Sequence, residues 1–133
     1  MGSIQSIQKI NYESMQNIIN NTSNKFLLIN TLDITNQGCL IKNTILPERE
    51  IAQLNYYLRH DKNINIVIYG ENCCDSKVID KYNQLYKIGF KNLYVYIGGL
   101  FEWLLLQDIY GEDEFPTNNK IIDILKYKGK PIV

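Results

Sequence analysis

The sequence lacks an excess of charge of either sign and lacks long hydrophobic runs. Its 133 residues include 14 Lys and Arg against 14 Asp and Glu, so the formal net charge is zero. A dedicated nucleic-acid binder is excluded, because neutralising phosphates requires a surplus of cations on one face. The longest apolar stretches, around Ile64–Tyr69 and Leu93–Phe101, are shorter than the roughly 18–20 residues that span a bilayer. We therefore expect a soluble protein without a transmembrane segment.

Cysteine, alanine and arginine are also scarce. Cys39, Cys73 and Cys74 form an odd set in a chain with no secretory signal, so no disulfide framework is expected and a cytoplasmic location is favoured. The chain has one alanine and two arginines, while Ile, Asn, Lys and Tyr supply close to half of it. Their codons are AT-rich, which indicates an AT-rich genome such as that of a protist or a giant DNA virus. For a viral protein the location would be the host cytoplasm.

In the rest of the sequence, segments typical of strands alternate with segments typical of helices. Unbroken apolar runs predict strands covered on both faces, and apolar residues at helical spacing predict helices. The predicted helices are Tyr12–Ile19, Pro47–His60, Ser76–Gly89, Leu100–Tyr110 and Ile121–Tyr127, and the predicted strands are Lys25–Asn30, Leu40–Ile45, Asn65–Tyr69 and Leu93–Ile97. This order predicts a three-layer α/β fold with a mainly parallel sheet of about five strands. Residues 1–133 are expected to form one domain, with a flexible N-terminus at 1–10 and a tail at 128–133.

The loop between the third predicted strand and the following helix is the main candidate site. In an open parallel sheet, ligands bind beyond the carboxyl ends of the strands, where such loops gather. The loop comprises Gly70, Glu71, Asn72, Cys73, Cys74, Asp75 and Ser76. Its backbone N–H groups lie near a helix N-terminus and are predicted to form an anion-binding cup.

Several motifs after this loop occur together in one order. They are Gly89-Phe90, a strand at Asn92–Tyr96, and Gly98-Gly99 followed by Trp103. With the preceding strand, loop and helix, they resemble the rhodanese-like domain and its GF…V…GG…W ending. Phe26–Asn30 resembles the early strand of that domain, so the resemblance covers nearly all of the chain. The run Phe101–Gly111 resembles a subgroup of small rhodanese-like proteins from protists and giant viruses. The resemblance implies a rhodanese-like fold and, for active members, sulfurtransferase chemistry.

The candidate loop departs from the pattern of active rhodanese-like enzymes. Their loop reads Cys-x-x-Gly-x-Arg-Ser, and its cysteine thiolate accepts a sulfane sulfur. On this pattern Gly70 stands at the nucleophile position, Cys73 at the glycine and Asp75 at the arginine, while Ser76 matches. An acid in place of the cation repels anions and raises the pKa of nearby thiols, and Glu71 adds to both effects. The resemblance therefore implies a non-catalytic domain, acting as a binding or regulatory module.

A relocated nucleophile is the alternative hypothesis. Cys73 and Cys74 lie in the same loop near a helix start, whose dipole favours a thiolate. Two adjacent thiols could hold or relay a sulfur, which would make the chain an unconventional sulfurtransferase, sulfur carrier or redox protein. No cofactor is implied, and two sulfurs with His60 elsewhere make a poor zinc set, so no metal site is predicted.

The remaining chemistry-bearing residues are interpreted as structural. His60 is expected to be solvated at a helix end, Cys39 to be a small buried residue, and Trp103 to anchor the core. The acidic residues between Asp108 and Glu114 are expected to form a solvated loop. The helix Leu100–Tyr110 has little polar face, so it is predicted to be deeply buried or to form an interface, such as a homodimer contact.

The N-terminal sequence predicts a lipid attachment site. Met1–Ser6 fits the short pattern for N-myristoylation, with Gly2 as the acceptor after removal of the methionine. One myristoyl chain binds membranes only marginally, so this would give peripheral membrane association. We expect the loop to bind a protein partner or a small anion, and we expect no binding of nucleic acid.

Overall fold

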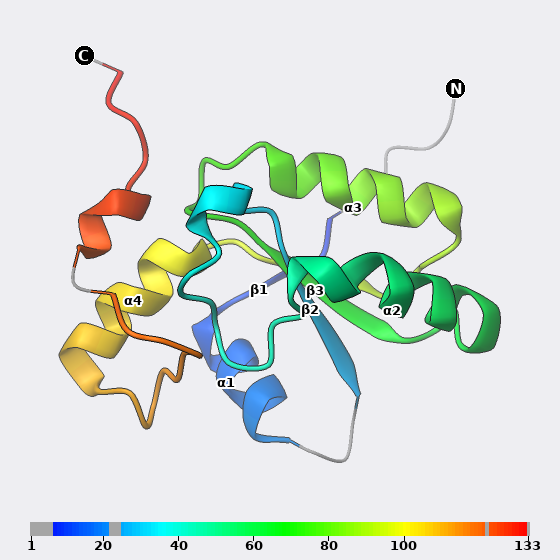
Figure 1. Ribbon diagram of the computed structural model, residues 1–133, viewed down its shortest axis with the longest axis horizontal. Coiled ribbons are helices and arrows are strands. Elements are labelled where there is room, and N and C mark those ends of the chain that lie inside the picture. The colour runs from blue at the N-terminus through cyan, green and yellow to red at the C-terminus, as the bar shows by residue number, and fades with distance from the viewer. Residues whose placement is uncertain (1–6, 22–24, 122, 133) are drawn as a thin grey trace.

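Four parallel strands form one sheet in the order β1-β4-β3-β2 (Figure 1). The computed structural model describes residues 7–21, 25–121 and 123–132. The strands are β1 (Lys9–Ile10), β2 (Phe26–Asn30), β3 (Asn65–Tyr69) and β4 (Leu93–Tyr96). The helices are α1 (Tyr12–Asn20), α2 (Pro47–His60), α3 (Lys77–Ile88) and α4 (Gly99–Tyr110), with 3-10 turns η1 (Ile34–Asn36) and η2 (Ile124–Tyr127).

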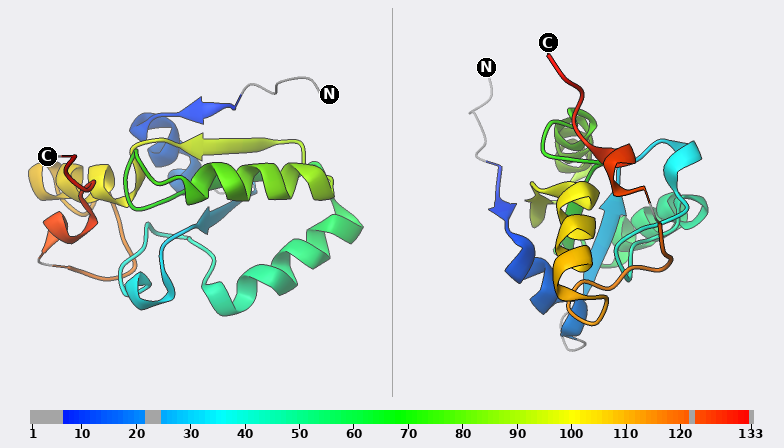
Figure 2. Two further views of the ribbon diagram at one scale, coloured as in Figure 1. Left: turned by 90° about the horizontal axis from the view of Figure 1, so that it is seen from above. Right: turned by 90° about the vertical axis from the view of Figure 1, so that its left-hand side faces the viewer.

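The sheet lies between two helical layers, as Figure 2 shows. Helices α1 and α4 cover one face, where the core is centred on the fully buried Trp103. Helices α2 and α3 cover the other face, where Tyr82 and Leu85 of α3 pack against Ile66 and Ile68 of β3. Strand β3 contributes side chains to both cores, which explains why its sequence is apolar from Ile66 to Tyr69. The predicted three-layer α/β fold with a parallel sheet is confirmed.

Local sequence features explain where the helices begin and end. Helix α2 begins at Pro47, whose fixed φ suits the first helical turn, and Glu48 and Glu50 lie near the positive end of the helix dipole. Helix α3 is followed by Gly89, whose φ of 124° favours glycine and whose N–H donates to Leu85 and Tyr86 carbonyls. Both boundaries follow from the sequence.

Several sequence predictions are wrong in detail. Among the described residues the sheet has four strands where about five were predicted, and Leu40–Ile45 is not one of them, since it forms turns with two isolated bridges. Within the predicted helix Ile121–Tyr127, residues Ile124–Tyr127 form the short 3-10 turn η2 and not an α-helix. Strand β1 has no counterpart among the predicted elements, since its two residues lie in the segment predicted to be a flexible N-terminus.

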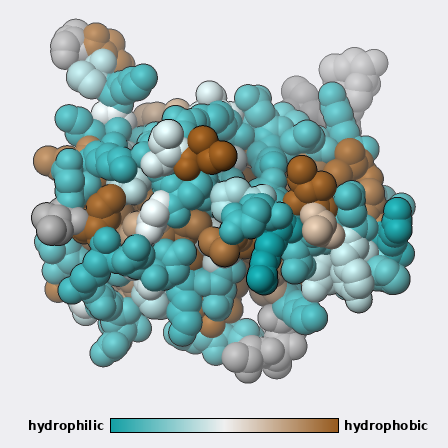
Figure 3. Space-filling view, in the orientation of Figure 1, coloured by the Kyte–Doolittle hydropathy of each residue, from teal (hydrophilic) through white to brown (hydrophobic). Residues whose placement is uncertain are grey.

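The surface carries scattered apolar side chains. In the described part of the chain, no helix is long and apolar enough to cross a bilayer. One side of α4 is buried, whereas its Leu105, Ile109 and Tyr110 are exposed, so the helix is only partly covered. The face seen in Figure 3 is mostly hydrophilic, with apolar side chains in small separate spots.

Candidate functional site

The candidate loop, residues 70–76, joins β3 to α3 at the carboxyl edge of the sheet. The strands are parallel, so the residues after β2 and β4 reach the same edge. Thr31 follows β2 directly, and its backbone N–H donates to the Tyr69 carbonyl at the end of β3 over 3.0 Å. Gly99 begins α4 shortly after β4. The connections that follow β2 and β4 therefore lie beside the loop.

The Asp75 carboxylate is folded into the loop and accepts several hydrogen bonds there. Its Oδ2 accepts from the backbone N–H of Glu71 over 3.2 Å and from the Thr31 hydroxyl over 3.0 Å. Its Oδ1 accepts from the backbone N–H of Lys77 over 3.0 Å, and its carbonyl accepts from the Val78 N–H. Asp75 thus caps α3, whereas the Ser76 side chain makes no capping bond. Of the loop N–H groups predicted to form an anion cup, that of Glu71 is therefore bonded to a carboxylate of the chain itself.

Gly70 faces this carboxylate closely. A Cβ atom added to Gly70 would overlap the Asp75 carboxylate and would lie 2.7 Å from Cγ2 of Val78. A side chain at this position therefore requires Asp75 to move. The absence of a side chain at Gly70 and the inward position of Asp75 are two parts of one packing arrangement.

Helix α4 holds the first two residues of the loop through backbone hydrogen bonds. The backbone N–H groups of Leu100 and Phe101 donate to the carbonyls of Gly70 and Glu71 over 2.9 and 2.8 Å. Gly99 has a φ of 70°, and a Cβ there would lie 2.7 Å from the Gly70 carbonyl oxygen. The close approach between helix and loop therefore requires glycine.

The middle of the loop is held by Asn72. Its Oδ1 accepts from the Cys74 N–H over 2.8 Å, and its Nδ2 donates to the Tyr127 carbonyl over 2.9 Å. Tyr127 is buried in η2, so Asn72 links the loop to the C-terminal part of the chain. On the other side, Asn36 Nδ2 donates to Glu71 over 3.2 Å. The loop is therefore fixed to segments far apart in the sequence.

The two cysteines form the exposed tip of the loop. The sulfur atoms of Cys73 and Cys74 lie 3.8 Å apart, and both residues are exposed. The neighbouring Cys73 thiol raises the pKa of Cys74. The predicted direction is therefore correct for Cys74, but the principal cause is the second thiol and not an acid. In the described part of the chain, no three residues of His, Cys, Asp or Glu are placed to hold a metal ion.

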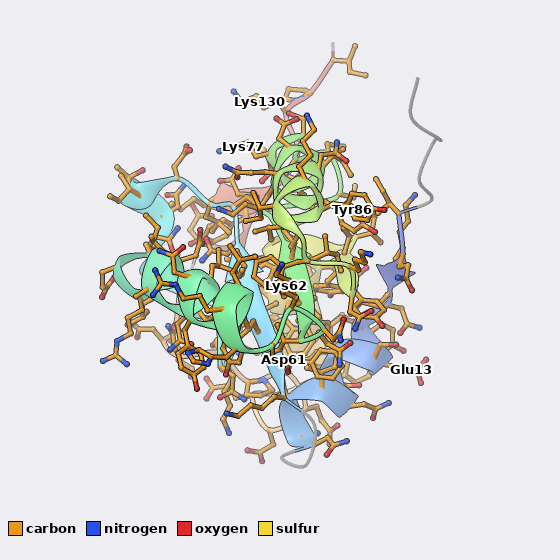
Figure 4. The ribbon with its side chains drawn as sticks, turned by 90° about the vertical axis from the view of Figure 1, so that its right-hand side faces the viewer. Glu13, Asp61, Lys62, Lys77, Tyr86 and Lys130 are labelled. Atoms are coloured by element: carbon orange, nitrogen blue, oxygen red, sulfur yellow. The ribbon has the colours of Figure 1, made fainter. Side chains whose placement is uncertain are left out.

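A groove of about 630 Å³ lies beside the loop at the carboxyl end of β2, with Thr31 in its lining. Ion pairs join Lys81 to Glu50 over 2.6 Å and Lys77 to Asp33 over 2.7 Å. Figure 4 shows Lys77 and Lys130 at the same end of the molecule, and both lower the pKa of Asp33. Two lysines and two acids, Lys77, Lys81, Glu50 and Asp80, line the groove, so its charges are balanced.

The other predicted residues take the structural roles expected of them. Cys39 is buried, and burial raises the pKa of its thiol. Trp103 is buried and its indole N–H donates to the Pro116 carbonyl over 3.1 Å. His60 is exposed, with its ring beside Tyr56. In the acidic loop, Glu112 pairs with Lys120. Gly2, the predicted acylation site, lies outside the described residues.

Sequence reasoning missed Thr31, Asn36 and Tyr127, which hold the loop through Asp75, Glu71 and Asn72 respectively. Only Thr31 had a local indication, since it follows the end of a predicted strand at the functional edge.

No protein-family model and no curated protein sequence matches this chain. Solved structures with the same fold do match. A yeast protein tyrosine phosphatase of the rhodanese family has a TM-score of 0.61 at 18% identity, covering 92% of this chain and 99% of that one. The rhodanese-like domain of an Anabaena protein has a TM-score of 0.61 at 22% identity, covering 88% and 82%. A single-domain sulfurtransferase from Saccharomyces cerevisiae has a TM-score of 0.56 at 14% identity, covering 86% and 100%. The chain therefore has the rhodanese-like fold.

Proposed function

We propose that this chain is a rhodanese-fold binding or regulatory module without the catalytic activity of sulfurtransferases or phosphatases of that fold. The observation that carries the proposal is the Asp75 carboxylate, which accepts hydrogen bonds from the Glu71 N–H of the loop, from the Lys77 N–H at the start of α3 and from the Thr31 hydroxyl. Aligned with the Cys-x-x-Gly-x-Arg-Ser loop of active rhodaneses, Gly70 takes the place of the nucleophile and Asp75 that of the cation. The chain thus lacks the thiolate and carries a negative charge where an anionic substrate would bind.

The same packing argues against a small anion as the natural ligand. A free anion would compete with a covalently attached carboxylate for the Glu71 and Lys77 N–H groups, and would be repelled by it. A protein partner fits better, because the loop tip is exposed and the adjacent groove has polar walls of balanced charge. We therefore propose that a partner protein contacts the loop 70–76 and the groove beside it.

Two assays on the purified wild-type chain test the loss of catalysis. Cyanide-dependent release of thiocyanate from thiosulfate measures sulfur transfer, and hydrolysis of p-nitrophenyl phosphate measures phosphatase activity. Both are expected to stay at the level of a blank without protein. Gly70→Cys alone is expected to remain inactive, because Asp75 occupies the space and keeps its charge. Gly70→Cys with Asp75→Arg replaces both missing groups and is the matched variant. Turnover by the wild type would contradict the proposal.

A second candidate is a sulfur carrier or sulfurtransferase that uses Cys73 or Cys74. The observation in its favour is the exposure of both thiols at the carboxyl edge of the sheet, 3.8 Å apart. Treatment with a persulfide donor followed by mass spectrometry separates the two functions. Wild-type turnover that disappears in Cys73→Ser or Cys74→Ser would establish the carrier and overturn the non-catalytic proposal.

A further inference from the structure

We propose that Cys73 and Cys74 form a dithiol site that chelates the arsenic atom of a monosubstituted trivalent arsenical. The site consists of two exposed sulfur atoms 3.8 Å apart at the tip of a braced loop. It is independent of the function proposed above, because it needs two free thiols and neither sulfur transfer nor a partner protein.

The distance between the sulfurs suits a single bridging atom. A bond of about 2.3 Å from each sulfur, the length of a zinc–thiolate bond, spans 3.8 Å with an angle of about 110° at the bridging atom. Arsenic–sulfur bonds have a similar length, and pyramidal trivalent arsenic has somewhat smaller angles, so the two sulfurs move slightly closer together on binding. The two sulfurs can therefore bind one arsenic atom with little movement.

The alternatives available to two adjacent cysteines are less favourable. Neighbouring Cα atoms are about 3.8 Å apart, whereas disulfides usually join Cα atoms about 4.4–6.8 Å apart, so a disulfide here would be strained. Zinc requires four ligands, and in the described residues no third His, Cys, Asp or Glu is placed to join the pair. A monosubstituted arsenical needs two thiolates and no other protein ligand, which matches what the loop provides.

The binding step is a condensation without a change of oxidation state. The hydrated arsenical carries one carbon substituent and two hydroxyl groups on arsenic(III). Each thiol forms one arsenic–sulfur bond and loses its proton, while one arsenic–oxygen bond breaks and the hydroxyl leaves with that proton as water. Two thiols and one hydrated arsenical therefore give one cyclic dithioarsenite and two waters. No oxidant or reductant is required.

The surrounding contacts prepare the pair for this reaction. Asn72 accepts the Cys74 N–H and is itself bonded to the Tyr127 carbonyl, so the tip is fixed before a ligand arrives. A fixed pair also avoids the entropy loss of bringing two separate thiols together.

Phenylarsine oxide is the probe for this site. Native mass spectrometry of the reduced full chain is expected to show one phenylarsenic group per molecule with the loss of two hydrogens. The adduct should survive an excess of 2-mercaptoethanol and be released by dithiothreitol. Cys73→Ser and Cys74→Ser are each expected to weaken binding by about a hundredfold or more, because the second bond is no longer intramolecular.

Cys39→Ser is the matched control, since Cys39 is buried and should contribute nothing to binding. If that variant fails to fold, alkylation and peptide mapping of the wild-type adduct give the same information: Cys39 alone should remain free. The proposal is overturned if the wild type takes up no arsenical, if either tip variant binds as tightly as the wild type, or if mapping places the adduct on Cys39.

Discussion

The base and the tip of the loop 70–76 differ in how far their functional groups are exposed to solvent. The base, formed by Gly70, Glu71 and Asp75, is bonded to Thr31, to α4 and to the first turn of α3. The tip, formed by Cys73 and Cys74, is exposed to solvent. A rhodanese-like fold can therefore keep the loop's attachment to the sheet while its chemistry changes. Here the base is filled by an internal carboxylate, and two exposed sulfur atoms lie at the tip.

The largest effect is expected from adding a side chain at the base. Gly70→Cys places a Cβ against the Asp75 carboxylate and Val78, so the free energy of unfolding should fall by about 2–3 kcal/mol. Urea denaturation followed by circular dichroism measures the change. The exposed Gly38 is the matched control, because nothing lies within 4 Å of an added Cβ there, and Gly38→Cys should change stability much less.

Removing Asp75 in the same variant sharpens the test. Gly70→Cys with Asp75→Ala should be less destabilised than the sum of the two single changes, because the overlap and the carboxylate disappear together. Additive effects in this double-mutant cycle would show that Gly70 and Asp75 do not share the space at the base.

A smaller loss is expected when only the carboxylate is removed. Asp75→Ala leaves the N–H groups of Glu71 and Lys77 without their acceptor and should lower the free energy of unfolding by about 1–2 kcal/mol, since water replaces part of these bonds. Urea denaturation provides the value. Asp113→Ala, in the exposed loop after α4, removes the same charge and should have almost no effect. Equal effects at the two positions would contradict the role of Asp75.

Asn72 connects the base to the tip, and its replacement should have an intermediate effect on stability and a local effect on hydrogen exchange. Asn72→Ala removes the bonds to Cys74 and Tyr127, so we expect a destabilisation of about 1 kcal/mol and faster hydrogen exchange in η2. Exchange measured by mass spectrometry on peptides from residues 120–132 tests this. Asn55→Ala, on the exposed side of α2, should leave that exchange unchanged.

The sequence was sufficient to predict an element where an unbroken apolar run, or a residue that typically begins a helix, marks its position. Asn65–Tyr69 and Pro47–His60 are observed with the predicted bounds, because β3 is apolar from Ile66 onward and α2 begins at proline. Leu40–Ile45 has the exposed Lys42 and Asn43 in its middle and forms turns there, while its buried Ile41 packs in the core with Tyr69 and donates its backbone N–H to the Tyr69 hydroxyl. Periodicity detects burial and cannot by itself separate a strand from a buried turn.

The position of the candidate loop could be predicted, because the loop follows a strand, but the hydrogen bonds within it could not. The acids Glu71 and Asp75 were expected to repel anions, but the sequence gives no indication that Asp75 turns inward. That orientation depends on Thr31, which lies 44 residues earlier and reaches Asp75 only through the pairing of β2 with β3. Long-range contacts of this kind require the three-dimensional arrangement of the strands.

The smallest expected effect concerns the tip. Cys73 raises the pKa of Cys74, so Cys73→Ser should lower it and shift the pH midpoint of Cys74 alkylation by iodoacetamide downward. Because the thiolate is the reacting form, alkylation at pH 7 should be faster in the variant. Stability should change by less than about 0.5 kcal/mol, as expected for an exposed side chain. Cys74 alkylation is followed by peptide mass spectrometry, and Cys39→Ser serves as the variant that leaves the midpoint in place. An unchanged midpoint in Cys73→Ser would mean that the two thiols act separately, and the tip would then lose the coupling that distinguishes it from the base.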